Sequence, residues 1–230
     1  MAVSSSMDRL LADGPLLCLV TDSAASRLPL EEAVALAVYG GVTLVQVRDK
    51  LLSGRELLAL AQRIIERVEG RARIVVNQRV DIAYASAADG VHLPSNGIAP
   101  AAAREMLGNS AIIGQSIHVV ADIKRCAGSP IDYFELGTIF ESRTHPGGPT
   151  QGLEPLRAAA RTSTPIIAIG GISAETAGAV LEAGAAGVAV ISAILGDSDP
   201  RNAAARIRDA MARAWPARAT SDFPHEVAPT

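Results

Sequence analysis

Short apolar runs alternate along this chain with longer stretches in which apolar residues recur at helical spacing. The short runs are rich in valine, isoleucine and leucine, as is typical of buried parallel strands. They cover residues 16–21, 43–48, 73–77, 90–93, 111–115 and 132–137, and two more begin at Pro165 and Gly187. The stretches between them predict helices over residues 29–39, 53–68, 80–87, 100–107, 119–127, 174–183 and 200–214. Ser53 with Glu56 forms a capping-box signature at one helix start.

The order of these elements predicts an α/β protein, a closed (β/α)8 TIM barrel of eight strands and eight helices. An open doubly wound sheet is the alternative, but units this short and evenly spaced favour closure. We assign residues 1–12 to an N-terminal lead-in, 13–215 to the single barrel domain and 216–230 to a disordered tail. A hydrophobic content of 49% with only 3% aromatic residues predicts a core of small aliphatic side chains.

Charge and cysteine content narrow the classes of partner. The net charge is −3 and no long basic cluster occurs, so nucleic acid and anionic membranes are poor candidates. No segment approaches the roughly 18 apolar residues of a membrane span, and no signal peptide is evident. Cys18 and Cys126 lie among apolar or small residues, so we expect buried, unpaired thiols in a reducing compartment. These features predict a cytoplasmic protein.

The last two predicted strands end in small residues that suit an anion. The run at Pro165 ends in Gly170 and Gly171, and Ser173 then resembles a helix N-cap. The run at Gly187 ends at Ile191 and Ser192. The loops after strands seven and eight of such barrels frequently bind phosphate through bare backbone N–H groups. We therefore predict a phosphorylated small-molecule ligand.

Polar residues end several other predicted strands, where a barrel of this class carries its site. Gln46 and Arg48 share a strand face with Lys50 just beyond, and Arg48 is either an anion clamp or part of a salt-bridged rim. Asn77 either contacts a ligand or caps the next helix. Ser116 follows the fifth predicted strand.

Acid/base candidates lie nearby. His118 follows Ser116, and Glu135 points either into the barrel or towards the helices. The long connection 138–152 offers Thr138 and His145 and could act as a mobile lid. No metal-binding cluster is evident in the sequence.

Together these segments resemble the thiamine phosphate synthase/TenI family from about Leu16 to Ala214. The matching pieces are QVRDK, NQRVDIA, ADGVHLPS, IGQSIH, DYFELGTIF, AIGGIS and GAAGVAVISAI. The resemblance implies a (β/α)8 barrel that binds thiazole phosphate, and it leads us to expect a homodimer. By matching positions, Arg48 would clamp a carboxylate or phosphate, and Gly170, Gly171 and Ser192 would hold the phosphate.

Departures from the family pattern bear on its two branches. Synthases join a pyrimidine diphosphate to thiazole phosphate with Mg²⁺, and their pattern has aspartates where this chain has Gln78 and Gly97, and a lysine at His145. Mg²⁺ prefers carboxylate oxygens. These departures favour a TenI-type thiazole tautomerase, an isomerase that aromatises carboxythiazole phosphate by proton transfer and needs no metal or other cofactor.

Another departure leaves the acid/base residue open. The histidine of the TenI branch corresponds to Thr138, so His118, Glu135 or His145 would have to replace it. One alternative is thiamine-phosphate synthase, with Asn77 and substrate groups holding Mg²⁺, and the preserved QVRDK favours it. The other is a non-catalytic regulator that binds thiazole phosphate, as Thr138 suggests.

Overall fold

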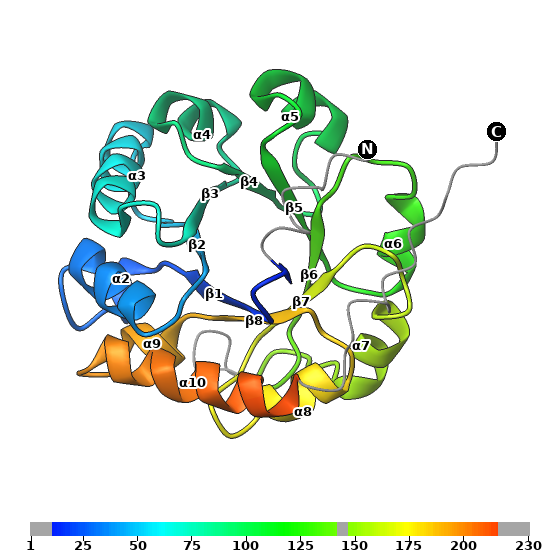
Figure 1. Ribbon diagram of the computed structural model, residues 1–230. Helices are drawn as coiled ribbons and strands as arrows, with labels where there is room; N and C mark the ends of the chain where they lie inside the picture. The colour runs from blue at the N-terminus through cyan, green and yellow to red at the C-terminus, as the bar shows by residue number, and fades with distance from the viewer. Residues whose placement is uncertain (1–10, 142–146, 216–230) are drawn as a thin grey trace.

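The computed structural model describes residues 11–141 and 147–215 of the chain. Its eight parallel strands pair in sequence order, and the last pairs with the first, so the sheet closes into a barrel (Figure 1). The strands are β1 (Leu16–Val20), β2 (Leu44–Val47), β3 (Arg73–Asn77), β4 (Gly90–Leu93), β5 (Ile112–Ile117), β6 (Tyr133–Gly137), β7 (Ile166–Ile169) and β8 (Gly187–Val190). The closed barrel confirms the predicted fold class and excludes the open sheet.

Helices form an outer ring around this barrel (Figure 1). After the short 3₁₀ turn η1 (Ser23–Ala25), they are α2 (Leu30–Tyr39), α3 (Gly54–Val68), α4 (Val80–Ser86), α5 (Pro100–Leu107), α6 (Ala121–Arg125), α7 (Leu153–Ala159), α8 (Ala177–Glu182), α9 (Ser192–Leu195) and α10 (Pro200–Ala214). Helix α10 packs against both α2 and α8, so it closes the ring between them.

Local side-chain hydrogen bonds set several helix starts. The predicted capping box is confirmed, because the Ser53 N–H donates to Glu56 Oε2 at 2.8 Å and the Glu56 N–H donates to Ser53 Oγ at 3.4 Å. The predicted N-cap at Ser173 is wrong. The Ser173 hydroxyl donates to Glu175 at 2.5 Å, and Thr176 is the N-cap residue of α8. Helix α7 follows a long connection for which no helix range was predicted.

Strand alternation divides the buried side chains between two cores. Outward-facing residues pack against the helices in one large aliphatic cluster. Inward-facing residues fill the barrel, namely Leu16, Cys18, Val20, Leu44, Val75, Ile112, Tyr133, Ile167 and Ala189. Burying such side chains stabilises the fold by roughly 25 cal/mol per Å² of apolar surface. The apolar filling plugs the barrel below the carboxyl ends of its strands.

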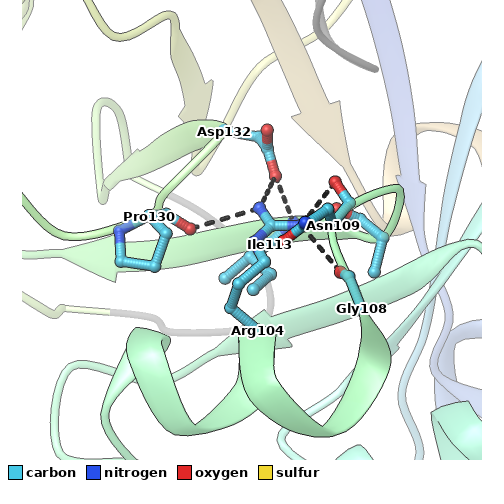
Figure 2. A network of polar contacts seen from close by, with 7 residues as sticks. Arg104, Gly108, Asn109, Ile113, Pro130 and Asp132 are labelled. Atoms are coloured by element: carbon cyan, nitrogen blue, oxygen red, sulfur yellow. Dashed lines mark hydrogen bonds and ion pairs between the residues drawn. The ribbon is translucent and has the colours of Figure 1, made fainter.

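Arg104 of α5 ties together the amino ends of β5 and β6 (Figure 2). Its guanidinium forms an ion pair with Asp132 at 2.8 Å, and the same Asp132 oxygen accepts the Ile113 N–H at 2.7 Å. The guanidinium also donates to the carbonyl oxygens of Gly108, Asn109, Ala111 and Pro130. These contacts lie at the end of the barrel opposite to the carboxyl ends, so they stabilise the scaffold and do not shape the site.

Two other sequence predictions concern the cysteines and membrane-spanning segments. Cys18 and Cys126 are free thiols, and Cys18 is buried as predicted, whereas Cys126 is only half-buried. Within residues 11–141 and 147–215, no helix is long and apolar enough to cross a membrane. The predicted tail, most of the lead-in and His145 lie outside the described residues.

Candidate active site

A cavity of about 480 Å³ opens at the carboxyl ends of the strands. Its walls come from strand ends and loops around the barrel, and they mix apolar side chains with a few polar groups. Such a composition is usual for a small-molecule site. Most predicted site residues line this cavity, namely Gln46, Arg48, Asn77, Ser116, His118, Glu135, Thr138, Gly170, Gly171, Ile191 and Ser192. The structure thus brings together residues that are far apart in the sequence.

The predicted phosphate-binding residues meet on one side of the cavity. Gly170 and Gly171 follow β7, and Ile191 and Ser192 follow β8. Ser192 begins α9, so its N–H and that of Ala193 precede any intrahelical acceptor. Backbone N–H groups in this position attract anions. The two loops therefore form a wall suited to a phosphate.

Glycine is required at this wall for two reasons. Gly170 and Gly171 have φ values of +105° and +64°, which side-chain-bearing residues rarely adopt. A Cβ on Gly170 would also lie 2.5 Å from Thr138 Cγ2, and one on Gly171 would lie 2.3 Å from the Glu141 carbonyl oxygen. The glycines thus let the segment after β6 pack directly on the β7 loop.

Among the described residues, Arg48 is the arginine that lines the cavity. Thr21 holds its backbone, because the Thr21 hydroxyl donates to the Arg48 carbonyl and accepts the Arg48 N–H, both at 2.8 Å. Among the described side chains, none forms an ion pair with Arg48, so the salt-bridged-rim alternative does not hold there. The guanidinium is available to a ligand anion. The predicted contact Lys50 is exposed and does not line the cavity.

The floor of the cavity carries a buried polar network. His92 Nδ1 lies 3.0 Å from the Tyr133 hydroxyl, and His92 Nε2 lies 2.8 Å from Ser116 Oγ. Tyr133 reaches His92 by crossing Gly114, where a Cβ would lie 2.1 Å from the phenol ring. Glu135 faces inward beside this network, with Oε1 3.6 Å from His92 Nε2. Of the two predicted orientations, Glu135 therefore adopts the one that points into the barrel.

Burial shifts the protonation of both titratable groups on the floor towards their neutral forms. It lowers the pKa of His92 to about 3 and raises the pKa of Glu135 to about 7, against which the Arg48 charge acts weakly. His92 is thus neutral near pH 7, and its contact with Glu135 is not an ion pair. Glu135 Oε2 is buried and has no hydrogen-bond partner among the described residues. A buried polar atom without a partner is costly.

The other acid/base candidates lie at the rim or outside the described residues. His118 is exposed, and its backbone N–H donates to Asp122 Oδ2 at 2.9 Å. Thr138 lines the cavity, and its carbonyl accepts the Gln151 N–H at 2.9 Å, which anchors the far end of the β6–α7 connection. His145 is not described. Of the predicted acid/base residues, Glu135 is the one at the cavity floor.

Sequence reasoning did not assign a role to His92 and Tyr133. Strand alternation could have identified Tyr133, because Tyr133 and Glu135 lie on the same face of the strand. If Glu135 points into the barrel, Tyr133 points there too. The strand register then completes the network, since Ser116 pairs with Glu135 and His92 pairs with Gly114. No local pattern predicts that register.

The oxygen donors of the cavity can be compared with the needs of Mg²⁺, which the synthase branch uses. That ion favours octahedral oxygen ligands, commonly one or two carboxylates plus substrate phosphates. Gln78 and Gly97 do not line the cavity, and among the described residues its carboxylates are those of Glu135 at the floor and Glu141 at the rim. The described residues contain no group of three or more His, Cys, Asp or Glu side chains that could hold a metal ion. The described residues therefore hold no site that would bind Mg²⁺ through protein side chains alone, without substrate oxygens or waters.

Comparison with known proteins places this barrel in a family. The sequence profile described as thiamine monophosphate synthase matches residues 17–194. The thiamine-phosphate synthase of Roseiflexus sp. strain RS-1 is 37% identical over 210 residues, covering 90% of this chain and 89% of that protein. The thiamine-phosphate synthase of Chlorobium luteolum is 40% identical over 197 residues, covering 83% and 90% respectively.

Solved structures agree with the sequence matches. A thiamine phosphate pyrophosphorylase from Pyrococcus furiosus superposes with a TM-score of 0.78 and 31% identity, covering 86% of this chain and 96% of that one. The 3-hexulose-6-phosphate synthase from Salmonella typhimurium superposes with a TM-score of 0.67 at 15% identity, covering 86% and 99% respectively. The second likeness shows the shared fold alone.

The relatives correct the prediction of a TenI-type tautomerase. That prediction depended on a few departures, at Gln78, Gly97 and His145, and gave them more weight than the rest of the barrel. Curated proteins that are 37% to 41% identical over most of their length carry the synthase name instead. Side chains at three positions change more readily than a whole barrel, so they are weak evidence for a branch. This chain belongs to the thiamine monophosphate synthase family.

Proposed function

We propose that this protein is a thiamine-phosphate synthase, a transferase that joins a pyrimidine diphosphate to thiazole phosphate and releases diphosphate. The observation that carries the proposal is a cavity with Arg48 and two amide-bearing loops, in a chain that is 37% identical to a curated synthase over 90% of its length. Both substrates are anions, and these groups are the ones that bind anions.

The chemistry needs two anion positions and a heterocycle position. The thiazole ring nitrogen forms a bond to the methylene carbon of the pyrimidine, while the bond from that carbon to diphosphate breaks and its electron pair leaves with diphosphate. The amides beside Gly171 and Ser192 hold the thiazole phosphate. Arg48 faces the diphosphate and stabilises the charge that develops on it. Because the described residues hold no site that would bind Mg²⁺ through protein side chains alone, no step is assigned to that ion.

The test is formation of thiamine phosphate from the two substrates, followed chromatographically over a range of Mg²⁺ concentrations. Arg48→Ala should lower kcat/KM about 100-fold or more, because it removes a charged donor aimed at the leaving group. Arg63→Ala is the matched control, since Arg63 lies on α3 in an exposed pair with Glu31 at 3.3 Å. It should leave kcat/KM unchanged. Absence of product from the unmodified protein at every Mg²⁺ concentration would refute the proposal.

A further inference from the structure

We propose that Glu135 is a specificity residue that recognises the aminopyrimidine ring of the diphosphate substrate by accepting an N–H from its amino group. This inference rests on the proposed function and assigns one residue to one substrate. It concerns binding and adds no covalent step.

The first observation is geometric. The Glu135 side chain is 7% exposed, lies at the floor of the cavity, and has an Oε2 atom with no hydrogen-bond partner among the described residues. Its neighbour His92 is already engaged by Tyr133 and Ser116 and does not approach Glu135 closer than 3.6 Å. The fold therefore holds a buried acceptor at the floor of a ligand cavity, and no described residue donates a hydrogen bond to it. Buried acceptors without partners are rare in native proteins, and a ligand donor is a direct explanation.

The second observation is the arrangement of charge. Arg48 and the amide-bearing loops lie on the walls, whereas Glu135 lies on the floor, so a phosphate is drawn to the walls and repelled from the carboxylate. The part of a ligand that reaches Glu135 must therefore be uncharged or cationic and must carry a donor. An aminopyrimidine meets this requirement, because its amino group donates and the adjacent ring nitrogen is basic. A neutral thiazole ring has no N–H, so it can accept a hydrogen bond from a protonated carboxyl but cannot donate one to Oε2.

Protonation supports the same assignment. Burial raises the pKa of Glu135 to about 7, so the carboxyl is available in both forms near neutrality. A protonated carboxyl accepts the amino N–H through one oxygen and can donate its proton to the ring nitrogen. A carboxylate pairs instead with a protonated ring. Either form makes two complementary hydrogen bonds to the same edge of the ring.

The decisive experiment measures binding by calorimetry to the full chain, with pyrimidine diphosphate, thiazole phosphate and inorganic diphosphate as separate probes. Glu135→Leu should weaken pyrimidine diphosphate about 10- to 100-fold and leave the other two probes within about twofold. Glu135→Gln is the matched variant, because its amide presents the same acceptor and a donor to the ring nitrogen, so it should retain most of the affinity. Equal affinity of wild type and Glu135→Leu for pyrimidine diphosphate, or an equal loss for all three probes, would overturn the inference.

A second measurement needs no variant. A pyrimidine diphosphate that lacks the amino group should bind the unmodified protein about 10-fold or more weakly than the aminated compound. Equal binding of the two compounds would overturn the inference even if Glu135→Leu failed to fold. Failure of the proposed function is distinguishable, because it would appear as absent thiamine phosphate formation while amino-dependent binding through Glu135 persisted.

Discussion

Replacement of Glu135 by glutamine should stabilise the protein at alkaline pH and have a much smaller effect at acid pH. In the folded protein the pKa of Glu135 is raised by burial to about 7, against an ordinary value of 4.5. Below pH 4.5 the carboxyl is protonated in both folded and unfolded chains, so it adds no penalty. As the pH rises from 4.5 to about 7, Glu135 ionises in the unfolded chain before it ionises in the folded protein. The free energy of unfolding therefore falls until the pH exceeds about 7.

The magnitude follows from the size of the shift. The pKa of Glu135 rises from 4.5 to about 7 on folding, and each pKa unit corresponds to about 1.36 kcal/mol. The free energy of unfolding is therefore lower by about 3 kcal/mol above pH 7 and by about 1 kcal/mol at pH 5. Glutamine is neutral at all these values and avoids the penalty. The variant should therefore gain about 2 kcal/mol relative to wild type between pH 5 and pH 8. For a chain of this length that is a relative rise in Tm of roughly 4–8 °C.

The assay is chemical denaturation of both proteins at pH 5 and pH 8, followed by circular dichroism. Comparing the pH slopes removes any constant effect of the amide, such as a changed hydrogen bond. His92 does not confuse the comparison, because burial lowers its folded pKa to about 3 and its contribution is shared by both proteins. Parallel pH profiles of wild type and Glu135→Gln would refute the reasoning, since they would mean that Glu135 ionises in the fold without penalty.

Two further predictions separate the site from its scaffold. Gly171→Ala should weaken thiazole phosphate binding at least 10-fold, because the new Cβ would lie 2.3 Å from the Glu141 carbonyl oxygen. Gly70 is the matched control, since it has a similar φ of +72° and a Cβ there would have nothing within 4 Å. Gly70→Ala should leave the affinity unchanged. Equal losses from the two alanines, measured by calorimetry, would contradict this. Arg104→Ala should lower stability by about 2–4 kcal/mol and leave thiazole phosphate affinity intact, because half-buried Asp132 loses its ion-pair partner and keeps the Ile113 N–H. The exposed Arg157→Ala should change stability by less than about 0.5 kcal/mol, and an affinity loss confined to Arg104→Ala would contradict the separation.

The sequence alone determined the fold class of this protein and most of its strand positions. Strand runs, helical periodicity and the capping box at Ser53 are set by interactions between near neighbours, so they can be read locally. The rule that such barrels carry their sites at the carboxyl strand ends then identified Arg48, Gly170 and Ser192 as candidates. Sequence reasoning misjudged the branch of the family, because a few missing carboxylates cannot be weighed without a comparison over the whole chain.

Only the tertiary structure decided what the floor of the cavity contains. Alternation shows that Tyr133 and Glu135 share a face, but closure of the barrel and its register decide that this face is the interior. The same register brings His92 of β4 to Ser116 of β5, and Gly114 leaves the space through which Tyr133 reaches the histidine. These contacts join residues that are distant in sequence, and no local pattern encodes a distance between strands. The specificity proposal depends on Glu135 Oε2, which has no hydrogen-bond partner among the described residues. Only the three-dimensional arrangement shows this.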